Sequence, residues 1–214
     1  STNAPFFENK GPLNFDKIIV RFIPDAFTRF SEFLAGNIDI IWSIPPENIG
    51  EIENDKNYQI FEGLQAGVCW IMVNHRNEPL NDLAVRKAIS LAIDREEIKK
   101  ALDNRVRIAY GMISPSQICY SAEGEKQFEA ENAMNIEEAK KLLAEAGWED
   151  KNGDGILEKG DKSLTLWLAV PLDRSPIKSS APVIQAQLKK IGIDLKLREY
   201  ETAYVKQLVR DHDY

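Results

Sequence analysis

A pattern of strand, helix and strand near the C-terminal end constrains the fold of this 214-residue sequence more than any other feature. Residues 164–170 are apolar and β-favouring, residues 177–191 carry apolar side chains at helical spacing, and residues 193–199 return to a strand pattern. Gly192 marks the end of the helix, because glycine readily adopts the backbone conformation that closes one. Two strands joined in this way run parallel, with a right-handed crossover. The sequence therefore predicts a parallel β-α-β unit and the α/β fold class.

Strands and helices also alternate in the first 66 residues. A helix should begin at an Asp25 cap and end before Gly36, and a short helix should follow over residues 45–54. Three strands are expected between and around them, at residues 17–23, 38–44 and 58–63.

Longer helices are expected in residues 67–214. Asp82, Asp94 and Asn135 are placed to cap three of them, because a short polar side chain can accept a hydrogen bond from a free amide of the first turn. A last helix is expected near Tyr204. Residues 104–133 are polar and contain Pro and Gly, so we expect irregular structure there.

A second motif joins a short strand to a helix between Gly63 and Asp94. Residues 68–73 are apolar, residues 74–81 form a polar turn, and the helix that follows is amphipathic. The residue types from Asn74 to Glu96 read N-x4-P-x2-D-x2-V-R-x-A-x3-A-I-D-R-E. This segment resembles the extracellular solute-binding proteins of family 5, which serve ABC importers of peptides, nickel and related solutes. Further similarity, in the family's order, covers nearly the whole chain and is clearest at residues 15–49, 137–148 and 183–197.

The resemblance implies part of a two-lobed, periplasmic-binding-protein-like fold of type II. Residues 5–66 would belong to the first lobe and residues 67–214 to most of the second, larger lobe, while residues 1–4 look like a remnant of an expression vector. Full members of the family are longer and carry an export signal and often a lipid anchor. We therefore expect a fragment of a periplasmic or extracellular protein, held at the cell membrane only by a lipid anchor outside this sequence.

Four residues are candidates for contact with a solute. Trp70 lies beside the expected hinge, where the resemblance implies an aromatic residue that faces the cleft; the alternative is an ordinary core aromatic. Asp173 and Arg174 follow a strand, and ligands of open α/β sheets bind beyond the carboxyl ends of strands; the alternative is a solvated loop. Asn74 is the fourth candidate, with bracing of the strand-to-helix turn as its alternative.

Residues 150–161 have the spacing of a calcium-binding loop. Oxygen-bearing groups stand at alternate positions, and Gly155 permits the bend that lets them surround one hard cation. The expected ligands are Asp150, Asn152, Asp154, the Ile156 carbonyl, Glu158 and Asp161. Two features depart from the usual loop, since Asp161 is shorter than the customary glutamate and a strand is expected to follow. The alternative is a polar turn without an ion; a bound calcium would be structural, and no cofactor is required.

Composition and motif content exclude several other classes of protein. The formal net charge of −7 gives no positive field for phosphate backbones, so we expect no nucleic-acid partner. No apolar run approaches the roughly 18 residues of a membrane span. His75 and His212 lack ligands at metal spacing, and no nucleophile stands near a base, so we expect no enzyme. Cys69, in a strand, and Cys119, in a loop, are expected to be free, the first of them buried, with a disulfide as the alternative.

These features together predict the substrate-binding component of an ABC importer. It would capture a peptide or related small solute between two closing lobes and deliver it to membrane permease subunits. The alternatives are a calcium-stabilised interaction module and a ligand sensor built on the same fold. By itself the chain is expected to hold half a cleft and to bind solute weakly.

Overall fold

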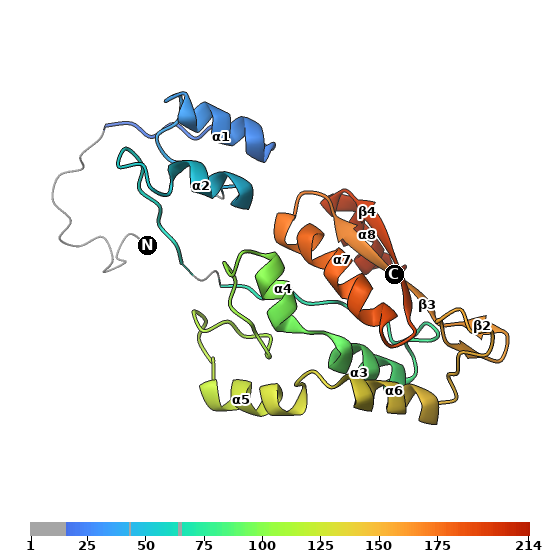
Figure 1. Ribbon diagram of the computed structural model, residues 1–214. Coiled ribbons are helices and arrows are strands. Elements are labelled where there is room, and N and C mark those ends of the chain that lie inside the picture. The colour runs from blue at the N-terminus through green and yellow to red at the C-terminus, as the bar shows by residue number, and fades with distance from the viewer. Residues whose placement is uncertain (1–15, 43, 64–65) are drawn as a thin grey trace. The chain divides into compact units, whose positions relative to one another are not determined.

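The computed structural model describes residues 16–42, 44–63 and 66–214, and the chain divides into two units, Ser1–Tyr58 and Gln59–Tyr214. The first unit holds α1 (Ala26–Leu34), the 3-10 turn η2 (Pro46–Asn48) and α2 (Ile49–Ile52), with α1 and α2 side by side (Figure 1). Asp25 caps α1 as predicted, because its carboxylate accepts a hydrogen bond from the Thr28 amide at 2.7 Å. Phe30, Ile49 and Ile52 are buried in this unit.

The strands predicted near the N-terminus are wrong for the residues that the structure describes. Residues 17–23, 38–42, 44 and 58–63 form no strand, and residue 43 lies outside the described part. Many of their apolar side chains are exposed, to 92% at Phe22 and 87% at Ile40. The local sequence favours extended backbone, but a strand also needs a neighbour to accept and donate its hydrogen bonds, and none of the described segments supplies one.

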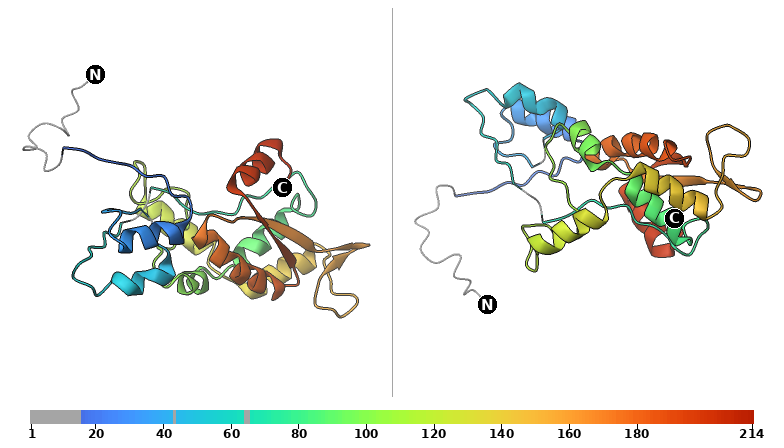
Figure 2. Two further views of the ribbon diagram at one scale, coloured as in Figure 1. Left: turned by 90° about the horizontal axis from the view of Figure 1, so that it is seen from above. Right: turned by 60° about the horizontal axis from the view of Figure 1, so that its bottom comes forward.

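The second unit is built on the parallel pair β3 (Thr165–Pro171) and β4 (Asp194–Tyr200), which are joined by α7 (Ser175–Lys189). Their register runs from Thr165 opposite Asp194 to Pro171 opposite Tyr200, so the predicted parallel β-α-β unit is confirmed. Helix α7 covers one face of the pair, and α8 (Thr202–Asp211) lies against the other (Figure 2). Helices α3 (Leu83–Ala92) and α6 (Ile136–Glu145) pack together and complete the core with α7.

The helix that starts at Asp82 begins where the sequence predicts. Asp82 accepts a hydrogen bond from the Ala84 amide at 2.9 Å. Arg86, one turn on, donates to the carbonyls of Leu80 and Asn81 at 2.7 and 2.9 Å. The arginine of the family motif therefore fixes the turn that leads into α3, since its guanidinium satisfies two carbonyls that the turn leaves free. Asp94 caps α4 (Arg95–Ala101) in the same manner.

Residues 104–133 contain a helix that the sequence analysis missed. Helix α5 (Ala122–Glu131) is capped by Ser121 and has no buried residue, so it lacks the apolar stripe that usually reveals a helix. Glu125 of α5 instead accepts hydrogen bonds from Arg107 and Tyr120, which are 18 and 5 residues away in the sequence. Contacts between distant residues of this kind carry no local signal.

Residues 68–73 form no strand, although a strand was predicted there. A short hairpin appears where none was predicted, with β1 (Glu158–Lys159) antiparallel to β2 (Lys162–Ser163).

Cys69 and Cys119 are both free and both exposed. The expected free thiols are therefore confirmed, whereas the expected burial of Cys69 is wrong because its segment has no strand neighbour to cover it. Within the described residues, no helix has the length and apolar content that crossing a membrane requires.

Candidate functional site

The carboxyl end of the β3–β4 pair holds two of the residues that the sequence singled out. Asp173 follows β3, and its carboxylate accepts a hydrogen bond from the hydroxyl of Thr202, the first residue of α8. Arg174 is the residue before α7, and its exposed side chain makes no capping hydrogen bond. The Asp173 carboxylate thus binds the first residue of α8. The Arg174 guanidinium lies open to solvent at the same end of the sheet.

Asn74 lies at the other end of α8. Its side-chain amide donates to the His212 carbonyl at 3.0 Å and accepts from the Arg76 amide at 3.2 Å, and the residue is buried. His212 closes α8 with a left-handed backbone. Because α8 has ten residues and a helix rises about 1.5 Å per residue, Asp173 and Asn74 lie at positions about 15 Å apart along this helix.

Trp70 is exposed to 57% in the segment before the turn at residues 74–81, and its neighbours Ile71 and Met72 are exposed to 36% and 46%. The structure therefore places this indole on the surface of its unit and outside the core. A large apolar ring at the surface is available to contact a ligand or another part of a larger fold.

The predicted calcium loop brings three carboxylates together. One oxygen each from Asp150, Asp154 and Glu158 lie within 4.8 Å of one another. The amide nitrogen of Asn152 donates to Asp154 and Glu158, both at 3.0 Å. The Asn152 amide nitrogen thus lies between two carboxylates, where a cation could also lie. Three carboxylate oxygens that converge in this way are the kind of ligands that a hard cation prefers.

The rest of the loop is organised by its backbone. The Asp150 carboxylate accepts from the amides of Gly153 and Gly155 at 2.8 and 3.0 Å, and Asp154 accepts from the Ile156 amide at 2.8 Å. Asp161 lies outside the three-carboxylate group, in the turn between β1 and β2. In a standard calcium loop a helix follows, whereas here the β1–β2 hairpin follows. Asp161, the twelfth residue of the loop, belongs to this hairpin and therefore lies outside the cluster of three carboxylates.

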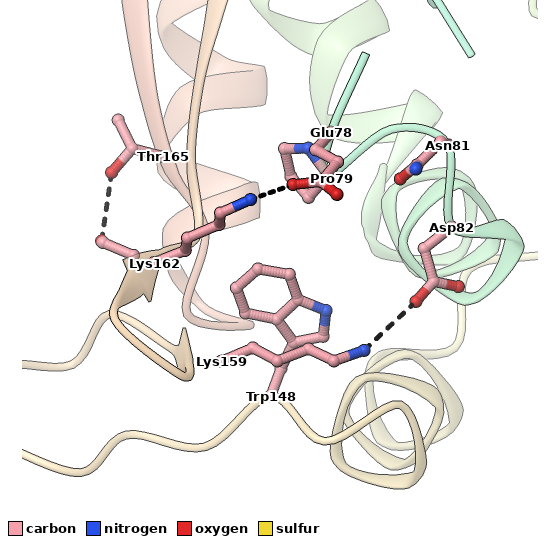
Figure 3. Close-up of a pocket in the computed structure, with 9 residues that line it drawn as sticks. Glu78, Pro79, Asn81, Asp82, Trp148, Lys159, Lys162 and Thr165 are labelled. Atoms are coloured by element: carbon pink, nitrogen blue, oxygen red, sulfur yellow. Dashed lines mark hydrogen bonds and ion pairs between the residues drawn. The ribbon is translucent and has the colours of Figure 1, made fainter. Parts of the chain in front are cut away.

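A pocket of about 850 Å³ lies at the amino end of β3, and none of its residues was singled out as a site by sequence (Figure 3). Its lining comes from three separate stretches: Glu78, Pro79, Asn81 and Asp82; Trp148; and Lys159, Lys162, Ser163 and Thr165. Each stretch alone looks like an ordinary turn or strand. Only the fold assembles them, which is why no spacing in the sequence marks the pocket.

Comparison with known proteins gives a consistent set of relatives. The family model of the bacterial extracellular solute-binding proteins, family 5, matches residues 2–214. The oligopeptide-binding protein AppA of Bacillus subtilis is 35% identical over 209 residues, which are 96% of this chain and 37% of AppA. The nickel-binding periplasmic protein of Escherichia coli is 29% identical over 89% of this chain and 37% of its own length.

Solved structures agree with these relatives. AppA of Bacillus subtilis in complex with a nonapeptide has a TM-score of 0.74 at 35% identity, over 87% of this chain and 36% of that one. NikA of Brucella suis in complex with Fe(III)-EDTA has a TM-score of 0.75 at 30% identity, over 95% of this chain and 41% of that one. The predicted α/β class, as part of a periplasmic-binding-protein-like fold, is confirmed. The chain spans a little over a third of the length of the curated relatives it matches.

Proposed function

Since the chain belongs to the bacterial extracellular solute-binding proteins of family 5, we propose that it forms part of the substrate-binding component of an ABC importer, with a peptide as its solute. One observation carries the proposal: the chain is 35% identical over 96% of its length to an oligopeptide-binding protein, and a solved structure of that protein holds a nonapeptide. The solute would pass to membrane permease subunits, and the protein would work in the periplasm or outside the cell, held by a lipid anchor. Binding and release complete this function, and no covalent step is needed.

The exposed groups of the second unit suit a peptide ligand. Trp70 offers an apolar ring, and Arg174 offers a cation at the carboxyl end of β3 and β4, where open α/β sheets bind ligands. Asp173 and Asn74 hold the two ends of α8, so they would position this helix beside the ligand. We assign Trp70 and Arg174 to ligand contact, and Asn74 and Asp173 to support of that surface.

Replacement of Trp70 by alanine tests this assignment. We expect peptide affinity of the full gene product to fall at least tenfold, since a buried aromatic contact typically contributes 1.4 kcal/mol or more, roughly, to an interface. Calorimetric titration with a peptide that the wild type binds measures the change. Trp167→Ala is the matched control, because Trp167 is similarly exposed, at 56%, in strand β3 of the same unit. Equal affinities for the wild type and Trp70→Ala would contradict the assignment.

A structural calcium ion in the loop of residues 150–158 is part of the same proposal. The convergence of Asp150, Asp154 and Glu158 supports it, and a calcium-stabilised interaction module or a sensor would share this feature. We expect millimolar calcium to raise the unfolding temperature and a chelator to reverse the rise, because a ligand of the native state stabilises it. Asp154→Asn should remove the response, and Asp211→Asn, an exposed acid at the end of α8, should keep it. An equal response in both variants would refute the site.

A further inference from the structure

The pocket at the amino end of β3 has charged walls of both signs. Lys159 and Lys162 stand on the side of the β1–β2 hairpin, and Glu78 and Asp82 stand on the turn before α3 (Figure 3). Lys162 forms an ion pair with Glu78, and Lys159 lies 3.9 Å from Asp82. The hydrogen bond from Lys162 lowers the pKa of the Glu78 carboxyl, which keeps that wall negative.

A buried donor without a partner lies between these walls. Trp148 is 5% exposed, and its Nε1 has no hydrogen-bond partner among the described residues. An indole N–H can only donate, and buried donors in native proteins nearly always meet an acceptor. Figure 3 shows the nitrogen on the side of Asn81 and Asp82, with the Lys159 side chain running past the lower edge of the indole toward Asp82.

The ion pairs that close the pocket open readily. The side chains of Lys159 and Lys162 are 50% and 70% exposed, and those of Asp82 and Glu78 are 32% and 59% exposed. Ion pairs this exposed contribute little net free energy, so a ligand that offers better partners can replace them. Lys159 also lies beside the Trp148 indole, with its ammonium 6.0 Å from the ring centroid, so its displacement would make room next to the ring.

We propose that this pocket is a second binding site for a small zwitterion, an amino acid or a dipeptide. The ligand carboxylate would accept from Trp148 Nε1 and pair with Lys159 and Lys162, and its ammonium would pair with Glu78 and Asp82. A carboxylate alone would leave the two acids without a cation, and an amine alone would leave the indole without an acceptor. The volume of about 850 Å³ lies within the range of about 300–1,000 Å³ usual for small-molecule sites.

This site is distinct from the one assigned to transport. Lys162, Ser163 and Thr165 stand at the amino end of β3, whereas Asp173 and Arg174 follow its carboxyl end, and β3 has seven residues. At about 3.3 Å per residue the strand separates the two places by about 20 Å. Free amino acids and dipeptides are also the products of peptide breakdown, so occupancy would report the supply of hydrolysed peptide.

The test follows the indole N–H of Trp148 directly. The chain is labelled with ¹⁵N in its tryptophan indoles, and the signal that disappears from the NMR spectrum in Trp148→Phe is that of Trp148. Glycylglycine is then titrated in, and acetate and ethylamine are titrated separately as singly charged probes. We expect a saturable shift of the Trp148 signal with glycylglycine and affinity at least tenfold weaker for either single charge. The Lys159→Gln/Lys162→Gln double variant should lose the response. Lys190→Gln, which removes an exposed lysine that caps α7, pairs with Glu97 and does not line the pocket, should keep it.

Four outcomes would overturn the proposal. No shift in the wild type removes the site, and an unchanged response in the lysine double variant removes its charged wall. Acetate that binds as tightly as glycylglycine shows an anion site instead. The fourth outcome is a shift of the Trp148 signal that is seen with this chain and is absent in the full gene product. In that case another part of the protein would fill the pocket. The Trp70 signal, recorded in the same spectra, reports the transport site separately.

Discussion

Glu125 shows how a single side chain can order a segment that has no apolar core. Arg107 donates to both of its carboxylate oxygens, at 3.1 and 2.5 Å, and Tyr120 donates at 2.5 Å. These hydrogen bonds, Arg107 first, lower the pKa of Glu125 from 4.5 to about 2. The bond to Glu125 also raises the pKa of Tyr120. One carboxylate thus joins α5 to the loop that precedes it.

Glu125→Gln should lower the free energy of unfolding by about 1–2 kcal/mol at pH 7, since charged hydrogen bonds are lost. Because the folded pKa lies below the unfolded one, the stabilisation is complete above about pH 4.5 and is lost as the pH falls through about 2. Urea unfolding at pH 7, 4, 3 and 2.5 should show the gap to wild type closing over this range. Glu129→Gln, exposed on the same helix, is the control; a gap that stays constant to pH 2.5 would contradict the account.

At the scale of elements, a buried glutamine joins α4 to α7. Gln187 is 1% exposed; it accepts from the Asp94 amide at 3.1 Å and donates to the Asp94 carbonyl and the Glu97 carboxylate at 3.2 and 2.8 Å. Gln187→Leu should cost about 1–3 kcal/mol, because the Asp94 amide and carbonyl and the Glu97 carboxylate lose the side chain that joins them to α7. Chemical unfolding measures the cost. Hydrogen exchange of the Asp94 amide should also become faster. The control Gln207→Leu, on exposed α8, should change neither the stability nor this exchange rate. Equal effects of the two variants would contradict the role of Gln187 in joining α4 to α7.

Local signals predicted the helices of this chain well, and distant contacts account for what was missed. Caps at Asp25, Asp82 and Asp94 involve residues two or three apart, so the sequence contains the whole interaction. Strands need partners elsewhere, and for residues 17–23 none of the described segments provides one. The three carboxylates of residues 150–158 were predictable together because they share one turn, whereas the pocket around Trp148 depends on stretches about 70 residues apart in sequence, as from Glu78 to Trp148.

At the scale of the whole molecule, the second unit presents a β-α-β unit with the exposed Arg174 at one end of β3 and an assembled pocket at the other. Family membership and the similarity to an oligopeptide-binding protein support the proposed capture of a peptide, which we assign to the first end. Exposed apolar side chains in the segments around Val20, Ile40 and Trp70 agree with a chain that covers a little over a third of its relatives' length. In a two-lobed protein such segments would gain neighbours.

Thermal unfolding of the full gene product with a panel of solutes tests the central claim most directly. The panel holds dipeptides, tripeptides, nonapeptides, nickel chelates and oligosaccharides, each with calcium and with a chelator. A peptide present at 100 times its Kd should add about 2.7 kcal/mol to the stability of the native state and raise the unfolding temperature. The account predicts this rise for a class of peptides. A rise with nickel chelates or sugars alone, or a response to calcium and to no solute, would contradict it.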